Sequence, residues 1–175
     1  MKKNVIALAL AATSVLSAHA FAAAGTVNFT GSVLDSACTV DTASKDQTVA
    51  LGAYNKTEFT AAGVKTAAKK FNIVLKDCPA TVTSAHVRFD GKPEATNSDL
   101  LAIDSSVTGA AKGIAINLMT ADKADLPLHG DNSYSYTLSS TEDNKLDFYA
   151  QYQSTAATVT AGPANSVATF SVVYN

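Results

Sequence analysis

The last eight residues constrain the fold of this chain more than any other stretch. They read ATFSVVYN, and four apolar or aromatic side chains share one parity: Ala168, Phe170, Val172 and Tyr174. A period of two predicts a half-buried β-strand. Residues 167–175 contain neither the charges nor the proline that normally block an exposed strand edge. Because the sequence ends there without a turn, we expect an open edge that something else must cover.

Residues 1–22 are typical of a secretory signal peptide. Two lysines precede an apolar run at residues 5–16, which is too short to cross a bilayer. Residues 20–22 read Ala-Phe-Ala and predict cleavage before Ala23, while cleavage after Ala20 is the alternative. We therefore expect an exported protein that does not span the membrane.

The remaining chain is one domain in length, with 47% hydrophobic and 16% charged residues. A net charge of −2 gives no electrostatic reason to expect nucleic-acid binding. The sequence contains no phosphate-binding loop, zinc signature or dinucleotide fingerprint. His86 and His129 are not placed beside a serine or cysteine nucleophile. We therefore expect neither an enzyme nor a protein with a cofactor or bound metal.

Two cysteines, Cys38 and Cys78, are present in this exported sequence. An even pair in such a protein predicts one disulfide, and a loop of this size corresponds to roughly 4 kcal/mol of stabilisation in the loop-entropy model. Metal binding is the weaker alternative, because two thiols and scattered histidines show no ligand spacing.

Short alternating segments separated by turn residues fill the region between the cysteines and the final strand. The predicted strands are residues 48–51, 71–76, 86–89, 100–103, 114–118, 134–138 and 146–152, with turns at 90–93, 129–132 and 162–163. No segment carries a sustained helical period. Roughly eight short strands predict an all-β sandwich of the immunoglobulin type.

A second uninterrupted alternation precedes the first cysteine. On one parity it places Val27, Phe29, Gly31 and Val33. An ordinary first strand of a sandwich would give the same period. However, glycine weakens a strand that must hold its own place, whereas it suits a strand that approaches another backbone closely.

With these motifs assembled, the chain resembles chaperone-usher fimbrial subunits, and in particular the type 1 major fimbrial protein family. The resemblance rests on the secretory leader, GTVNFTGSV at residues 25–33, SACTV around Cys38, FNIVLKDC ending at Cys78, and the closing ATFSVVYN. Gly162, fourteenth from the end, and Tyr174, the penultimate residue, complete the pattern.

The resemblance implies an incomplete immunoglobulin-like sandwich that lacks its final strand and is completed by donor-strand exchange. Residues 23–37 would be the donor extension and residues 38–175 the pilin domain. The implied donor side chains are Val27, Phe29, Gly31 and Val33. The implied acceptor groove and chaperone-binding residues are Gly162, Ala168, Phe170, Val172, Tyr174 and Asn175.

The implied partners are neighbouring copies of the chain or related subunits, a periplasmic chaperone and an outer-membrane usher. The chain would pass through the periplasm to a surface fimbrium. A different possibility remains open from the residues alone. A complete secreted immunoglobulin-like domain could bind glycan or protein through loops such as residues 90–98 and 120–131.

Overall fold

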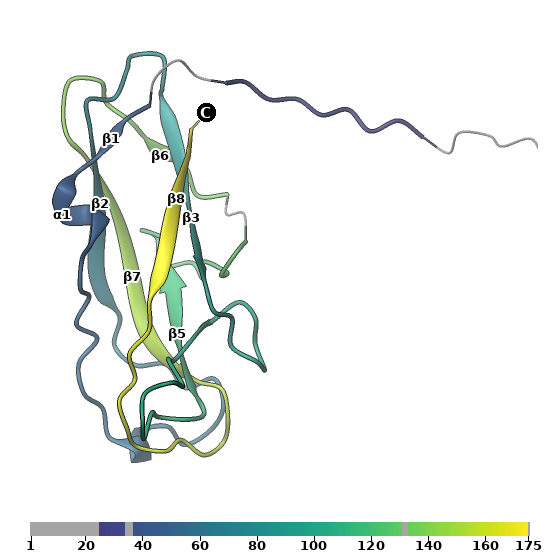
Figure 1. Cartoon of the computed structure of the whole chain (residues 1–175), viewed down its shortest axis with the longest axis vertical. Helices are drawn as coiled ribbons and strands as arrows, with labels where there is room; N and C mark the ends of the chain where they lie inside the picture. Colours follow the sequence, from purple (N-terminus) through teal and green to yellow (C-terminus); the bar gives the residue numbers. More distant parts are fainter. Residues whose placement is uncertain (1–24, 34–36, 131–132, 175) are drawn as a thin grey trace, which may run out of the picture. The chain divides into compact units, whose positions relative to one another are not determined.

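The structure is a computed structural model that describes residues 25–33, 37–130 and 133–174. The chain divides into two compact units, Met1–Val33 and Leu34–Asn175. In the first unit, residues 25–33 form neither helix nor strand, and each of them is exposed. The second unit contains all the strands of the described residues (Figure 1).

Two antiparallel sheets build the second unit. The larger has the order β1-β2-β7-β5-β4 and the smaller β6-β3-β8. The elements are β1 (Thr39–Val40), the helical turn α1 (Thr42–Lys45), the short 3₁₀ helix η1 (Lys56–Glu58), β2 (Lys69–Lys76), β3 (Ser84–Gly91), β4 (Leu101–Ala102), β5 (Ile114–Met119), β6 (Tyr136–Thr137), β7 (Asn144–Ser154) and β8 (Ala168–Tyr174). The predicted all-β architecture is confirmed.

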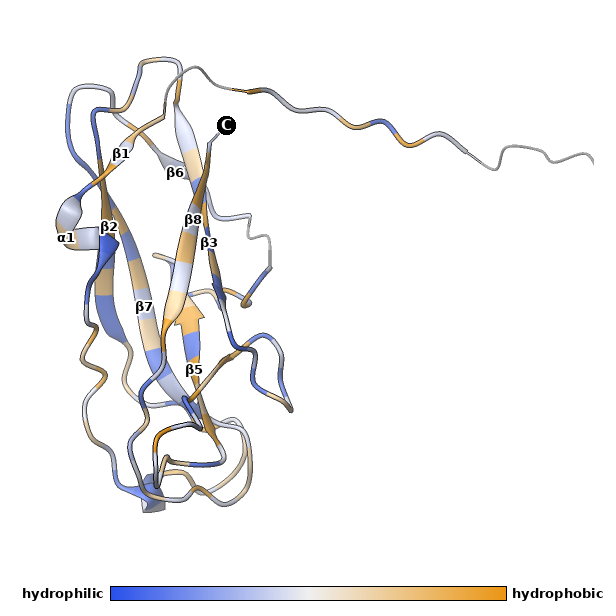
Figure 2. Ribbon diagram, viewed as in Figure 1, coloured by the Kyte–Doolittle hydropathy of each residue, from blue (hydrophilic) through white to orange (hydrophobic). Residues whose placement is uncertain are grey.

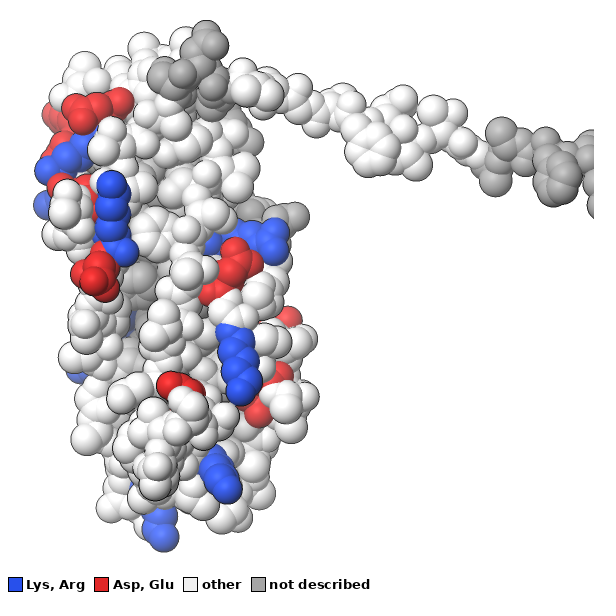
Figure 3. All heavy atoms as spheres, in the orientation of Figure 1, with Lys and Arg blue, Asp and Glu red and all other residues white. Residues whose placement is uncertain are grey.

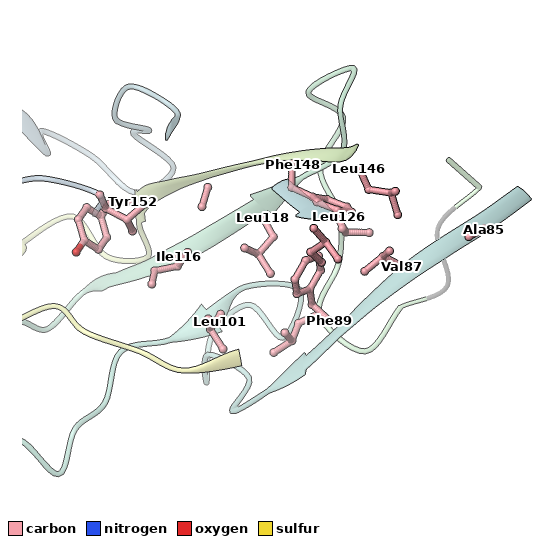
Figure 4. Close-up of a cluster of buried hydrophobic side chains, with 14 of the residues drawn as sticks. Ala85, Val87, Phe89, Leu101, Ile116, Leu118, Leu126, Leu146, Phe148 and Tyr152 are labelled. Carbon is pink, nitrogen blue, oxygen red and sulfur yellow. The ribbon is translucent and has the colours of Figure 1, made fainter. Parts of the chain in front are cut away.

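The core lies between the two sheets and follows from the period of two. Along β2 and β7 apolar residues alternate with polar ones, which Figure 2 shows as bands of colour. Figure 4 shows Val87 and Phe89 of β3 pointing toward Leu118 of β5 and Phe148 of β7. The rings of Phe89 and Phe148 meet edge to face, with 5.2 Å between their centroids. Such aromatic pairs add stabilisation beyond the area that they bury.

The predicted disulfide between Cys38 and Cys78 is present, and both cysteines are buried. It joins the start of β1 to the turn that follows β2. The side-chain amide of Asn144 donates to the Sγ atom of Cys78 over 3.3 Å. The disulfide therefore fixes the start of β1 to the core at this end.

The prediction of a strand at residues 48–51 is wrong. Val49 is half-buried and Leu51 is buried, so the alternation is real, but no strand forms there. Side chains that precede this segment occupy the edge of β2 instead. Ser44 Oγ accepts from the amide of Val74, and the Gln47 amide group donates to the carbonyl of Asn72. Polar side chains thus satisfy backbone groups of β2 that a neighbouring strand would otherwise pair with.

Three other predicted segments differ from the structure. The predicted strands at 100–103 and 134–138 are reduced to two residues each, in β4 and β6. The predicted alternation at β5 is buried on both faces rather than one. None of the helices in the described part of the chain has the length and apolar character needed to cross a membrane.

Candidate functional site

The second edge of β8 is the most unusual feature of the sandwich. β8 pairs antiparallel with β3 from Ala168 opposite Gly91 to Tyr174 opposite Ala85. On its other edge it pairs with no strand of the described residues. In an antiparallel ladder, alternate residues direct their amide and carbonyl groups away from the partner, so this edge presents unpaired backbone groups.

One face of β8 is apolar and half-buried. The side chains of Ala168, Phe170, Val172 and Tyr174 pack against the core, whereas the residues between them are exposed. We call these four side chains the β8 strip. The structure therefore reproduces the parity predicted for the strand, and it brings these four predicted site residues onto one face.

Phe170 connects the strip to the aromatic centre of the core. Its ring lies 6.3 Å from the ring of Phe89, which in turn contacts Phe148. Phe71 also packs beside Phe148, with 5.6 Å between centroids. The strip is consequently the half-exposed flank of the core, so any segment that covers it would complete a hydrophobic cluster that already exists.

Tyr174 closes one end of the strip. Its hydroxyl donates to the carbonyl of Cys38 over 3.4 Å. Burial raises the pKa of Tyr174, so the hydroxyl remains a donor at neutral pH. Val40 and Val49, from the segment after Cys38, are half-buried against the same core. These two side chains thus pack against the same core as the β8 strip.

The opposite end of the strip leads to a pocket of about 250 Å³. The apolar residues that line it include Tyr54, Phe59, Ala111, Ile114, Tyr152, Val159 and Ala164. Tyr54 and Tyr152 meet edge to face, and the Tyr152 hydroxyl donates to the carbonyl of Ala164 over 2.9 Å. Burial raises the pKa of Tyr152. No local pattern in the sequence predicts this pocket; the alternation in β7 indicates only that Tyr152 faces inward.

Gly162 also lines this pocket and lies apart from the β8 strip. A Cβ atom at this position would overlap the carbonyl oxygen of Gly109 and approach the Ala111 nitrogen to 2.8 Å. Glycine is therefore required by the close approach of two backbone segments. Asn175, the other residue predicted for the site, lies outside the described residues.

The predicted donor residues belong to the other unit and are fully available to a partner. Val27, Phe29 and Val33 are 75%, 93% and 100% exposed. Gly31 has no atom within 4 Å of the position where its Cβ would stand. Isolated exposed apolar residues are ordinary, but these three share one parity and would lie on one side of the segment if it paired as a strand.

The surface over β8 is also poor in charge. Residues 155–174 carry no charged side chain. In Figure 3, the basic and acidic atoms lie mainly on either side of β8, and few occur over the strand itself. An uncharged face bordered by charges is suited to an apolar partner segment rather than to an ion or a nucleic acid.

Comparisons with known proteins agree with this geometry. A family model described as "Fimbrial protein" matches residues 27–175. The probable major fimbrial subunit LpfA of Escherichia coli O157:H7 is 42% identical over 176 residues, which cover 99% of this chain and 97% of the relative.

Solved structures extend the likeness to the fold. An antigen and type I fimbria protein of Burkholderia pseudomallei is 35% identical, with a TM-score of 0.61, over 86% of this chain and 97% of that chain. A subunit of a chaperone-usher pilus is 27% identical, with a TM-score of 0.64, over 86% of this chain and 95% of that chain. The family is a structural one whose members form surface fimbriae. This chain belongs to the fimbrial protein family and is a structural subunit of a chaperone-usher pilus, with an immunoglobulin-like pilin fold.

Proposed function

We propose that the chain polymerises by donor-strand complementation, in which residues 25–33 of one subunit pair with the free edge of β8 in the next. The observation that carries this proposal is the one-sided pairing of β8, combined with a half-buried apolar strip along the same strand. Strand addition of this kind takes affinity from main-chain hydrogen bonds and fit from alternate side chains. Each subunit is donor at one end and acceptor at the other, so the contact is head to tail and builds a filament.

The side chains favour one antiparallel register. Residues 27–33 match β8 in length, seven residues against seven. In this register Gly31 lies opposite Phe170, Phe29 lies opposite Val172, and Val33 lies opposite Ala168. A large ring then covers the glycine, an arrangement known to rescue glycine in strands. A parallel arrangement of the same length would place Phe29 opposite Phe170 and leave Gly31 against Val172.

The energy available from this pairing is large enough to drive assembly. Burying Val27, Phe29 and Val33 contributes about 1.5 to 3 kcal/mol each, which is an upper estimate. Each ladder hydrogen bond adds about 1 kcal/mol. The total is comparable with the roughly 5 to 15 kcal/mol that stabilises a whole domain. Completion of the fold could therefore drive polymerisation without a nucleotide.

An exposed apolar edge also requires protection before assembly, because such edges template aggregation. We assign residues 1–22 to a signal peptide, residues 23–37 to the donor extension and residues 38–175 to the pilin domain. A periplasmic chaperone would cover the β8 strip with a strand of its own and hold the carboxylate of Asn175 through basic groups. An outer-membrane usher would then exchange that strand for the donor segment of the next subunit.

Thermal unfolding of a fused monomer tests the proposal. A copy of residues 23–34 is attached after Asn175 through a flexible linker and compared with the unfused mature chain. We expect a soluble monomer with a large rise in melting temperature. A matched fusion carrying Phe29→Ser in the added copy should recover only part of that rise, because it removes one apolar contact and keeps the backbone ladder.

An unchanged melting temperature in the fused chain would contradict donor-strand complementation. It would instead indicate a domain that is already complete.

A further inference from the structure

The strand registers place particular loops at each end of the pilin domain. At the end that carries Tyr174 lie two loops, here called the top loops: residues 77–83, which include Cys78, and residues 139–143, which precede β7. Residues 52–58, 109–113 and 155–166, here called the base loops, surround the pocket near the start of β8. β7 runs 11 residues between the two ends, which corresponds to about 33 Å.

The length of chain between the donor segment and the domain limits where two neighbouring subunits can lie. In the proposed register Val33 of the donor is opposite Ala168, at the base of the acceptor. Cys38 of the donor follows Val33 by five residues, which span at most about 18 Å when fully extended. The top loops of the donor must therefore lie close to the base loops of the acceptor.

The top loops carry acidic side chains in excess. Asp77, Glu142 and Asp143 are all exposed. Two lysines, Lys76 and Lys145, lie at this end, and the Nζ atom of Lys76 is shared between Asp41 at 2.7 Å and Asp143 at 3.6 Å. The hydrogen bond from Lys76 also lowers the pKa of Asp41. Asp77 and Glu142 thus have no ionic partner among the described residues, and Asp143 has only a long contact to Lys76.

The base loops present lysines that are available for such a partner. Lys56 and Lys112 are exposed, and neither forms an ion pair within the described residues. Both lie beside the pocket: Lys56 lines it, and the Lys112 amide donates to Thr160. The nearby carboxylates accept hydrogen bonds from backbone amides of neighbouring residues, Glu58 from Asn55 and Asp104 from Ser106. The tip of the molecule opposite β1 shows basic atoms in Figure 3.

We propose that the acidic top loops of one subunit dock against Lys56 and Lys112 of the next, forming a second interface beside the strand pairing. This inference rests on the proposed donor-strand function and adds the orientation of successive domains to it. Exposed ion pairs contribute little affinity and are screened by salt, so the contact sets the angle between domains more than it sets the strength of the polymer.

Zero-length cross-linking of intact fibres tests this interface. A carbodiimide joins carboxylates to amines without a spacer, and mass spectrometry identifies the linked peptides. We expect links from Lys56 or Lys112 to Glu142, Asp143 or Asp77 in fibres, and none of them in the fused monomer. Within one chain these groups lie at opposite ends of the domain, so such a link reports contact between subunits.

Charge reversal provides the second arm. Glu142→Lys with Asp143→Lys should remove the links and loosen the domain orientation seen by electron microscopy, as should Lys56→Glu with Lys112→Glu. Every subunit contributes its top loops to one neighbour and its base loops to the other. The chain that carries all four substitutions therefore again has opposite charges across the interface, and it should regain a fixed domain orientation. The control reverses Lys45 and Lys69, which are exposed elsewhere and form no ion pair in the described part of the chain.

Multimers that resist detergent report strand exchange separately. Suppose that multimers form but the cross-links join other residues, or that charge reversal leaves the domain orientation unchanged. The proposed interface between top and base loops is then wrong, while donor-strand complementation is not contradicted. If the unmodified chain forms no multimers, both proposals fail.

Discussion

The hydroxyl of Tyr174 donates to the carbonyl of Cys38, joining the end of β8 to the first residue fixed by the disulfide. This contact connects the edge strand of the smaller sheet to the start of β1, the edge strand of the larger one. The Tyr174 hydroxyl therefore anchors the C-terminal end of the β8 strip, while the outer edge of β8 pairs with no strand among the described residues.

Replacing Tyr174 by Phe removes this hydrogen bond and keeps the ring. We expect a loss of about 1 kcal/mol in the free energy of unfolding, measured by urea denaturation of the fused monomer. Tyr149→Phe is the control, because its ring contacts Lys123 and its hydroxyl forms no hydrogen bond among the described residues. Equal losses in both variants would argue against the contact.

The proposed register places Gly31 of the donor opposite Phe170 of the acceptor. A larger residue at position 31 should therefore be tolerated only when the residue at position 170 is smaller. Gly31→Leu should block multimer formation, because the added side chain meets the Phe170 ring. Phe170→Ala in the acceptor should restore part of it, while Ala168→Gly should not. The measurement is the yield of detergent-resistant multimers in each combination. Rescue by Ala168→Gly instead would indicate a register shifted by two residues.

The donor segment should act only through one parity. Phe29→Asp should leave a subunit that folds with its chaperone but cannot add itself to a growing fibre, because a charge would enter the hydrophobic core. Asn28→Asp, on the other parity, should assemble normally. Fibre incorporation counted by immunogold labelling distinguishes the two, and equal incorporation would contradict the donor assignment.

Gly162→Ala should destabilise the domain strongly, because the new methyl group overlaps the carbonyl oxygen of Gly109. Overpacking of this kind costs about 1 to 3 kcal/mol or more. Gly63→Ala is the control: Gly63 has a φ of 87° with open space around it, so only the backbone conformation is penalised. Thermal unfolding should show the larger loss at Gly162.

Acid should weaken the domain partly through Asp41. The hydrogen bond from Lys76 holds the pKa of Asp41 below its ordinary value of 3.8. A lowered pKa in the folded state means that the contribution is present above pH 3.8 and is lost as the pH falls through the folded pKa. Asp41→Asn should therefore flatten the decline of stability below pH 3.8, measured by urea midpoints. If the stability of this variant falls with pH as steeply as that of the unmodified chain, the loss is due to other carboxylates.

Much of the architecture could be predicted because period two is a local property. β2, β3, β7 and β8 each bury one face against the core, so their alternation is visible in the sequence. The burial of both faces of β5 could not be predicted in this way. On its outer face the Asn117 amide group donates to Asp125 and Gln153, and the Gln151 amide group donates to the sulfur of Met119.

The site was predictable to a similar degree. The β8 strip could be identified from its parity, whereas the pocket at its base depends on contacts between distant loops. Tyr54 and Phe59 lie in a segment rich in polar residues, and nothing local indicates that they meet Tyr152. The family resemblance implies that Gly162 belongs to the acceptor groove, whereas its contact with residues 109–111 is a tertiary feature that no local pattern indicates.

The lengths of the sheet edges carry a consequence for the shape of the polymer. Of the four edges, β1, β4 and β6 are two residues long, and β8 alone is seven. In polymer chemistry, the number of reactive ends on a monomer decides whether it makes chains or networks. One long acceptor edge and one proposed donor segment make a difunctional monomer. Such a monomer adds to a thread, because the described part of the chain offers no second long strand edge from which a branch could grow.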